Sequence, residues 1–266
     1  MIDAIKQVHF IGIGGIGMSA LAKFFLEKGA KVSGSDLQIS DITKDLINRG
    51  IKIGSGHDPD AVPAHVDLVI YSSAVPESNL ERVRTKELGI REMSYAEFLG
   101  ELSKQYSTIV VTGTHGKSTT TAMLGLMLEA AGYDPTVIVG SLISTWPLGN
   151  VRVGSGRFLV LEGCEHEANI LNLNPEAILI TNIELDHPDF YRDVDHLRTT
   201  FQEFINKLKG QGLVVRNQDD EQSMKLDIAR AVTFGTSDLA NYSIHGRDVK
   251  EGKQIAQFSS NEAAQE

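Results

Sequence analysis

Residues 107–121 read STIVVTGTHGKSTTT: an apolar run, a glycine-rich loop and the start of a helical stretch. A strand, a Gly-Lys-Ser loop and a helix in this order are typical of phosphate-binding loops, whose backbone N–H groups surround phosphate oxygens. The usual spacing, G-x-x-x-x-G-K-[ST], has its first glycine where this chain has Val111, so the loop is a variant. It predicts ATP binding by Gly113, Thr114, His115, Gly116, Lys117, Ser118 and Thr119.

Within that loop, Lys117 is expected to reach the β- and γ-phosphates, and the Ser118 hydroxyl is expected to ligate Mg²⁺. A glycine turn that merely carries a surface lysine is the alternative, but it leaves the Gly-Lys-Ser order at a helix start unexplained. The segments that follow alternate between strand and helix patterns. Strand patterns cover residues 157–161, 177–181 and 212–216, and helical patterns cover 119–131 and 194–207. This alternation predicts an α/β unit with a parallel sheet.

A second glycine-rich turn lies near the start of the chain, where residues 12–17 read GIGGIG. It follows a strand pattern at 8–12 and precedes a helical pattern at 16–28 and a strand pattern at 31–34, which together predict a Rossmann-like βαβ unit. Such a turn binds a nucleotide diphosphate at the helix N-terminus, and Asp36 is placed to accept hydrogen bonds from a ribose. Taken alone, the motif favours NAD by default. A tight turn that serves only packing is the alternative.

The bulk properties limit the function classes. With 266 residues, the chain is long enough for two α/β domains, which we place at 1–104, Rossmann-like, and 105–266, the ATPase domain, incomplete at its C-terminal end. A net charge of −10 argues against nucleic-acid binding. The sequence contains no signal peptide and no apolar run of about 20 residues, so we expect no membrane insertion. A single cysteine, Cys164, fits a cytoplasmic setting.

Carboxylates and a histidine follow the strand patterns of the second unit. Glu162 ends the pattern at 157–161, where parallel strands would bring it beside the phosphate loop, and His187 follows the pattern at 177–181. Each has an ordinary alternative: Glu162 as a helix cap and His187 as a hydrogen-bonded turn residue. For Glu165 the ordinary interpretation is an acidic residue in the first turn of a helix, and for Cys164 it is a small buried side chain. The sequence leaves these alternatives open.

Five stretches together resemble the Mur ligase family: 9–22 (HFIGIGGIGMSALA), 32–37 (VSGSDL), 71–75 (YSSAV), 113–123 (GTHGKSTTTAM) and 181–187 (TNIELDH). The resemblance implies that the first domain binds the UDP part of UDP-N-acetylmuramate rather than NAD. Asp36 and Ser73 would lie at the uridine side, and the diphosphate would face Gly14, Gly15, Ile16, Gly17, Met18 and Ser19. Lys117, Glu162 and His187 would be catalytic, with Ser118 and Glu162 holding Mg²⁺ and His187 near a second metal or the transferred phosphate.

The reaction implied by the resemblance is an ATP-dependent ligation of L-alanine to UDP-N-acetylmuramate through an acyl phosphate, in peptidoglycan synthesis. Two departures from the family pattern stand out. Residues 163–167 read GCEHE where the family more often has Ala-Asp-Glu-Ser-Asp, and the chain ends before the family's amino-acid-binding C-terminal domain. The alternatives are therefore a chain that binds UDP-muramate and ATP without ligating them, and an NAD-binding enzyme.

Overall fold

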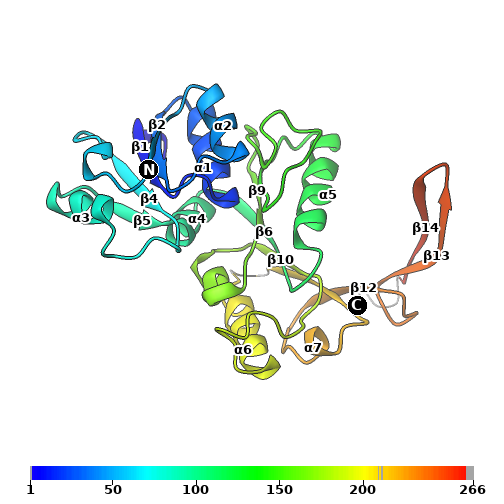
Figure 1. Ribbon diagram of the computed structural model, residues 1–266. Helices are drawn as coiled ribbons and strands as arrows, with labels where there is room; N and C mark the ends of the chain where they lie inside the picture. Colours follow the sequence, from blue (N-terminus) through cyan, green and yellow to red (C-terminus); the bar gives the residue numbers. More distant parts are fainter. Residues whose placement is uncertain (1, 209, 211, 262–266) are drawn as a thin grey trace. The chain divides into compact units, whose positions relative to one another are not determined.

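The computed structural model describes residues 2–208, 210 and 212–261, and it forms two compact units. The first comprises Met1–Tyr106 and Thr121–Leu161, and the second comprises Ser107–Thr120 and Glu162–Glu266. Both contain helices and parallel strands, which confirms the predicted α/β class (Figure 1). The domain division into 1–104 and 105–266 stays a prediction. None of the described helices is long and apolar enough to cross a membrane.

A five-stranded parallel sheet in the order β3-β2-β1-β4-β5 organises the first unit. Its strands are β1 (Gln7–Ile11), β2 (Lys31–Asp36), β3 (Lys52–Ser55), β4 (Leu68–Tyr71) and β5 (Glu92–Ser94). The helices between them are α1 (Ile16–Glu27), α2 (Asp41–Asn48), α3 (Leu80–Glu87) and α4 (Tyr95–Ser103), with short 3₁₀ turns at Ile2–Ala4 and Pro59–Ala61. The strand order reverses direction between β1 and β4, which is where open α/β sheets bind ligands.

Aromatic side chains fill the core beneath β1. Phe10 on β1 contacts Phe25 on α1 at a ring-centroid distance of 6.1 Å, and Phe25 contacts Phe98 on α4 at 5.2 Å. All three are at most 1% exposed. Burying such rings is the main stabilising contribution to a small sheet domain, so this cluster fixes α1 and the glycine turn before it. The first unit also holds β7 (Thr136–Ile138), β8 (Val151–Arg152) and β9 (Phe158–Glu162), with β7 paired to both β8 and β9.

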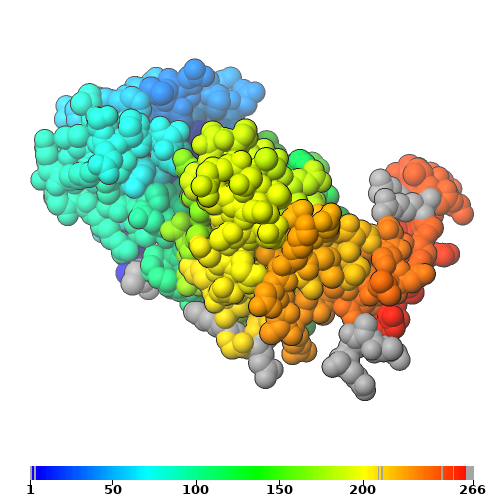
Figure 2. All heavy atoms as spheres, turned by 90° about the horizontal axis from the view of Figure 1, so that it is seen from below, coloured from blue at the N-terminus to red at the C-terminus, as the bar shows by residue number. Residues whose placement is uncertain are grey.

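The second unit has the strand order β14-β13-β12-β11-β10-β6. Its strands are β6 (Ser107–Thr112), β10 (Ala177–Ile180), β11 (Leu213–Asn217), β12 (Ala231–Gly235), β13 (Tyr242–Lys250) and β14 (Lys253–Ser260). Its helices are η3 (His166–Asn172), α6 (Val194–Ile205) and α7 (Glu221–Met224), and α5 (Lys117–Ala130) begins in it. In Figure 2 the yellow-to-orange part of the chain, which includes α6 and α7, forms one continuous surface on the face shown.

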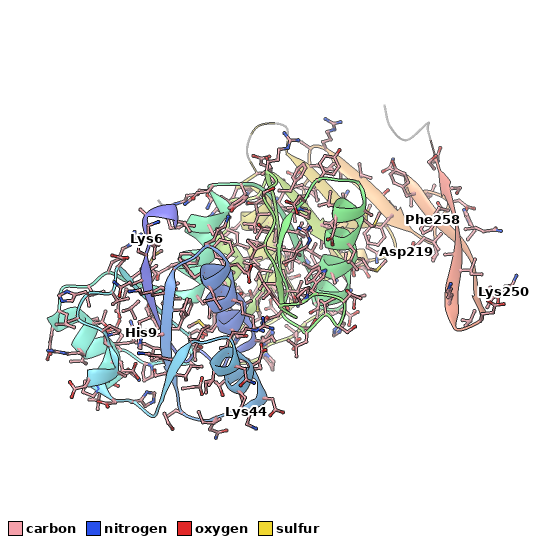
Figure 3. All side chains as sticks on the ribbon, turned by 90° about the horizontal axis from the view of Figure 1, so that it is seen from above. Lys6, His9, Lys44, Asp219, Lys250 and Phe258 are labelled. Carbon is pink, nitrogen blue, oxygen red and sulfur yellow. The ribbon has the colours of Figure 1, made fainter. Side chains whose placement is uncertain are left out.

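The end of the second unit differs from the sequence expectation. The sequence indicated only short strand-like pieces beyond Thr236, whereas β13 and β14 form an antiparallel hairpin with a register shift between His245 and Arg247. Phe258 on this hairpin is 73% exposed (Figure 3). The apolar side chains Tyr242, Val249, Ile255 and Phe258 are all exposed, so burial does not impose a clear alternation on them.

Candidate functional site

The phosphate loop runs from the end of β6 to the start of α5, as predicted. Gly113 has φ +128°, and a methyl group on its Cα would lie 2.7 Å from the Asn182 carbonyl oxygen. Only glycine fits this position without displacing the backbone. The loop is therefore in close contact with the residues that follow β10.

Hydrogen bonds tie the loop to the segment after β10. The Thr114 N–H donates to the Asn182 carbonyl at 3.0 Å, and the Thr114 hydroxyl donates to the Glu184 carbonyl at 2.9 Å. The His115 N–H donates to Asn182 Oδ1 at 2.9 Å, and the Thr181 hydroxyl donates to the His115 carbonyl at 2.7 Å. Since these bonds hold Thr114 and His115, the first half of the loop has a defined conformation in the structure. Gly116 and Thr119, by contrast, are exposed.

Two side chains at the start of α5 face acidic partners. Lys117 Nζ lies 3.0 Å from Glu165 Oε1 and donates to the Gly113 and Thr114 carbonyls at 2.7 and 3.0 Å. The Ser118 hydroxyl donates to Glu162 Oε1 at 2.9 Å. Glu162 thus lies beside the loop, at the position that the strand argument expected.

Glu165, which the sequence suggested only as a first-turn helix acid, is a neighbour of Lys117 that was not predicted. Its side chain is 1% exposed, and its Oε2 atom has no hydrogen-bond partner among the residues that the structure describes. Instead of starting a regular helix, it precedes η3, in which Glu167 and Ala168 have φ of 51° and 54°. Cys164, expected to be buried, is exposed, because this stretch leaves the sheet as an irregular loop.

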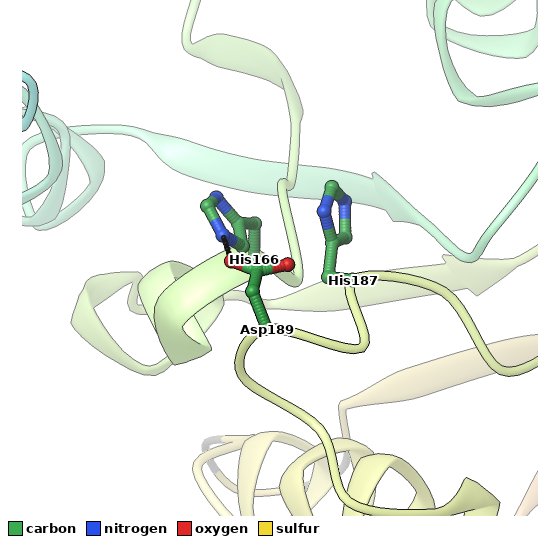
Figure 4. A group of neighbouring side chains, drawn as sticks. All are labelled: His166, His187 and Asp189. Carbon is green, nitrogen blue, oxygen red and sulfur yellow. Dashed lines mark hydrogen bonds and ion pairs between the residues drawn. The ribbon is translucent and has the colours of Figure 1, made fainter.

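His187 approaches the same carboxylate from the segment after β10. Its Nε2 atom lies 4.0 Å from Glu165 Oε1 and 4.0 Å from Asp186 Oδ2, and its ring stacks on His166 at a centroid distance of 4.3 Å. His166 Nε2 and Asp189 Oδ2 are 3.0 Å apart. This hydrogen bond holds the pKa of the Asp189 carboxyl below its usual value. Figure 4 shows the three side chains side by side.

The glycine turn of the first unit is held by Asp36. The Gly14 N–H donates to Asp36 Oδ2 at 2.8 Å, so this carboxylate binds the turn itself. Helix α1 starts after the N-cap residue Gly15 without a side-chain cap, which leaves backbone N–H groups available for an anion. A methyl group at Gly17 would lie 2.6 Å from the Tyr95 ring. The turn therefore has the shape and polarity of a diphosphate-binding loop.

The remaining predicted residues of the first unit lie in different surroundings. Ser73 is exposed after β4, whereas Met18 and Ser19 are buried. The Ser19 hydroxyl donates to the Ile16 carbonyl at 2.9 Å and accepts a hydrogen bond from Asn150 at 2.8 Å. The structure thus brings the glycines and Asp36 together, and it places Met18 and Ser19 in the packing beneath them.

Comparisons with known proteins find matches for both parts of the chain that contain a glycine-rich loop. The model of the Mur ligase family catalytic domain matches residues 7–107, and that of the Mur ligase middle domain matches residues 111–265. The UDP-N-acetylmuramate–L-alanine ligase of Clostridium perfringens is 40% identical over 252 residues, covering 93% of this chain and 54% of that protein. The enzyme of the same name from Clostridium novyi is 43% identical over 238 residues, covering 88% and 51%.

A solved structure extends the similarity to the fold. The UDP-N-acetylmuramate–alanine ligase of Thermotoga maritima matches with a TM-score of 0.85 at 32% identity, over 96% of this chain and 58% of that one. The chain spans about half the length of the curated relatives it matches. Because the two family models together cover nearly all of its residues, this chain belongs to the Mur ligase family.

Proposed function

We propose that this chain provides the UDP-sugar-binding and ATP-binding parts of a cytoplasmic ligase that joins L-alanine to UDP-N-acetylmuramate. The observation that carries the proposal is the grouping of Lys117 and Ser118 with Glu162 and Glu165 around the phosphate loop. Relatives of this chain are named for this reaction. The names of these relatives include UDP-N-acetylmuramate, which supports this UDP-sugar over NAD as the ligand of the first glycine turn.

The chemistry requires two anions, a carboxylate and a triphosphate, to meet. ATP phosphorylates the lactyl carboxylate of the sugar, giving an acyl phosphate and ADP. The amine of L-alanine then attacks the acyl carbon, and phosphate leaves from the tetrahedral intermediate. The Lys117 ammonium, held on the loop by two carbonyls, would offset phosphate charge during the transfer.

The loop also offers ligands for Mg²⁺. Ser118 Oγ and Glu162 Oε1 are 2.9 Å apart, and both are the hard oxygen donors that Mg²⁺ prefers. When bound, Mg²⁺ neutralises phosphate charge and orients the nucleotide. His187, with its ring nitrogen 4.0 Å from Glu165, would lie near the transferred phosphate or a second cation. Glu162 and His187 are thus proposed to act with Lys117 in catalysis.

In the first unit, the proposal places the diphosphate at Gly14, Gly15, Ile16 and Gly17, against the free N–H groups of α1. Asp36 would contribute to the uridine side while it holds the Gly14 N–H, and the exposed Ser73 would lie near it. Met18 and Ser19 lie in the first turn of α1 and are buried, so they would face the diphosphate through the backbone of that turn.

The test combines binding with turnover. The purified chain is titrated with ATP and with UDP-N-acetylmuramate, and phosphate release is then measured with each substrate omitted in turn. We expect both ligands to bind, and Lys117→Ala to weaken ATP binding at least about tenfold while leaving UDP-N-acetylmuramate binding unchanged, because one charged contact contributes roughly 1.5–3 kcal/mol. Any phosphate that the chain releases should depend on the presence of both UDP-N-acetylmuramate and L-alanine.

The outcomes separate the alternatives. Binding of both ligands without ligated product would favour a chain that only binds them. ATP hydrolysis at a rate that does not depend on UDP-N-acetylmuramate or L-alanine would contradict the proposal. Binding of NADH in place of the UDP-sugar would contradict it as well. Equal loss of both ligands in Lys117→Ala would show that the two sites do not lie in separate domains.

A further inference from the structure

A second group of side chains in the second unit has the composition of a metal site. His166, His187 and Asp189 each offer one ligand atom, and these atoms all lie within 4.8 Å of one another (Figure 4). The group is distinct from the Ser118–Glu162 pair, because two of its three donors are imidazole nitrogens rather than oxygens. His166 enters it from the start of η3, and the other two residues enter it from the segment after β10.

The donor set indicates which cation would bind. Imidazole nitrogen suits borderline divalent cations such as Zn²⁺, whereas Mg²⁺ prefers an all-oxygen octahedron and keeps several waters. We propose that His166, His187 and Asp189 form a binding site for a divalent cation of the zinc class, with selectivity opposite to that of the Ser118–Glu162 pair. The proposal rests on the proposed function in one respect, because both take His187 to lie near a cation. It does not require that the chain ligates its substrates.

The spacing of the group fits such a cation after a small adjustment. Three ligands at about 2.0–2.2 Å from a tetrahedral zinc ion lie about 3.4 Å apart. The His166 Nε2 and Asp189 Oδ2 atoms are already 3.0 Å apart, and the two stacked rings have centroids 4.3 Å apart. The three side chains are 33%, 34% and 69% exposed, so rotation toward a shared ion meets little packing.

A buried charge beside the group supports the same reading. Glu165 Oε1 lies 4.0 Å from His187 Nε2, and Glu165 Oε2 has no hydrogen-bond partner within the described part of the chain. Buried carboxylate oxygens are normally paired, because leaving one without a partner costs free energy. In the structure, Lys117 Nζ contacts the Oε1 atom of this carboxylate at 3.0 Å. A divalent cation bound to the His187 ring would bring further positive charge close to it.

The test measures cation binding without nucleotide, so it does not depend on ATP chemistry. The chain is freed of metal with a chelator and titrated with Zn²⁺ and, separately, with Mg²⁺ by isothermal titration calorimetry. We expect one Zn²⁺ per chain, bound at least about 100-fold more tightly than Mg²⁺, because nitrogen donors favour zinc. His166→Ser and Asp189→Asn should each weaken Zn²⁺ binding by about 10- to 100-fold, the scale seen when even outer-shell partners are removed.

Matched variants make the result specific. His65→Ser removes an exposed histidine outside the group and should leave Zn²⁺ binding unchanged. Glu162→Gln should also leave it unchanged, since that carboxylate belongs to the oxygen pair. Unaltered Zn²⁺ affinity in both His166→Ser and Asp189→Asn would overturn the proposal, as would equal affinity for Zn²⁺ and Mg²⁺. Circular dichroism checks that each variant is folded. If His166→Ser does not fold, Asp189→Asn still provides the test, because its position is 69% exposed. If ATP does not bind the parent chain, the ligase proposal fails while the cation result still stands.

Discussion

Replacing Lys117 by methionine tests whether its ammonium group is what compensates the buried Glu165 charge. The two groups are 3.0 Å apart, and their side chains are 15% and 1% exposed. Removing one partner of a buried pair typically costs about 3–5 kcal/mol, because the remaining charge stays desolvated. Lys117 keeps some contact with water, so we expect the lower end, a loss of about 3 kcal/mol in the free energy of unfolding.

The matching change, Glu165→Gln, removes the negative charge and leaves an amide oxygen that can still accept from Lys117. It should cost about 1.5 kcal/mol, the scale of one hydrogen bond weakened from charged to neutral. In the double variant no unpaired charge remains, so we expect a loss of about 2 kcal/mol rather than the sum of about 4.5. The coupling between the two positions is then about 2.5 kcal/mol.

Urea unfolding followed by far-UV circular dichroism, without nucleotide, measures all three variants at a common slope. Lys44→Met is the control, since Lys44 on α2 is 62% exposed and its partner Asp41 is 98% exposed (Figure 3). It should leave the unfolding midpoint unchanged. A double variant whose loss equals the sum of the single losses within about 0.5 kcal/mol would refute the reasoning, because the two groups would then act independently.

Two further predictions concern backbone and charge. Gly113→Ala should abolish ATP binding and destabilise the chain by about 1–3 kcal/mol, because φ +128° is strained for alanine and its methyl group would collide with the Thr181 side chain; calorimetry with ATP checks it, and unchanged affinity would contradict it. Asp134→Asn tests the carboxylate whose pKa is held far below 3.8 by hydrogen bonds from Ser155 and then from Arg152. A depressed folded pKa contributes stability above the unfolded value, so the difference in melting temperature between parent and variant should be largest near pH 7 and shrink as the pH falls below about 3.8. A difference that is constant down to pH 3 would count against the ion pair. Asparagine suits this position because φ is 46° there.

The sheet framework was predictable because each glycine turn lies between a buried strand and a helix, β1 and α1 in one case and β6 and α5 in the other. The strand expected at 8–12 is β1 (Gln7–Ile11), and that expected at 107–111 is β6 (Ser107–Thr112). Helix α2 escaped prediction because its eight residues are mostly polar, although its capping box at Ser40 and Thr43 is a readable start signal. Strand β3 escaped because it is largely exposed and carries no apolar run.

The candidate site was predictable only where the sheet dictates the neighbours. Glu162 ends β9, and the carboxyl ends of parallel strands meet at one edge, so its approach to Ser118 follows from topology. The Lys117–Glu165 pair does not follow, because Glu165 lies beyond the strand in a stretch whose backbone leaves the regular regions at Glu167. No periodicity specifies where such a stretch turns.

The same contacts bear on how the loop would exchange partners. In this structure the Lys117 ammonium is held by two loop carbonyls and by Glu165 Oε1, and it lies beside a loop that the segment after β10 keeps in place. Phosphate oxygens arriving at the loop would compete with a carboxylate for one ammonium. That exchange replaces one charge-assisted contact by another, so the ammonium need not pass through an unpaired state. Glu165 would then be left buried with less positive charge nearby, which is the situation that a cation on His187 would relieve. The loop lysine and the histidine group therefore have one buried carboxylate, Glu165, as a common neighbour.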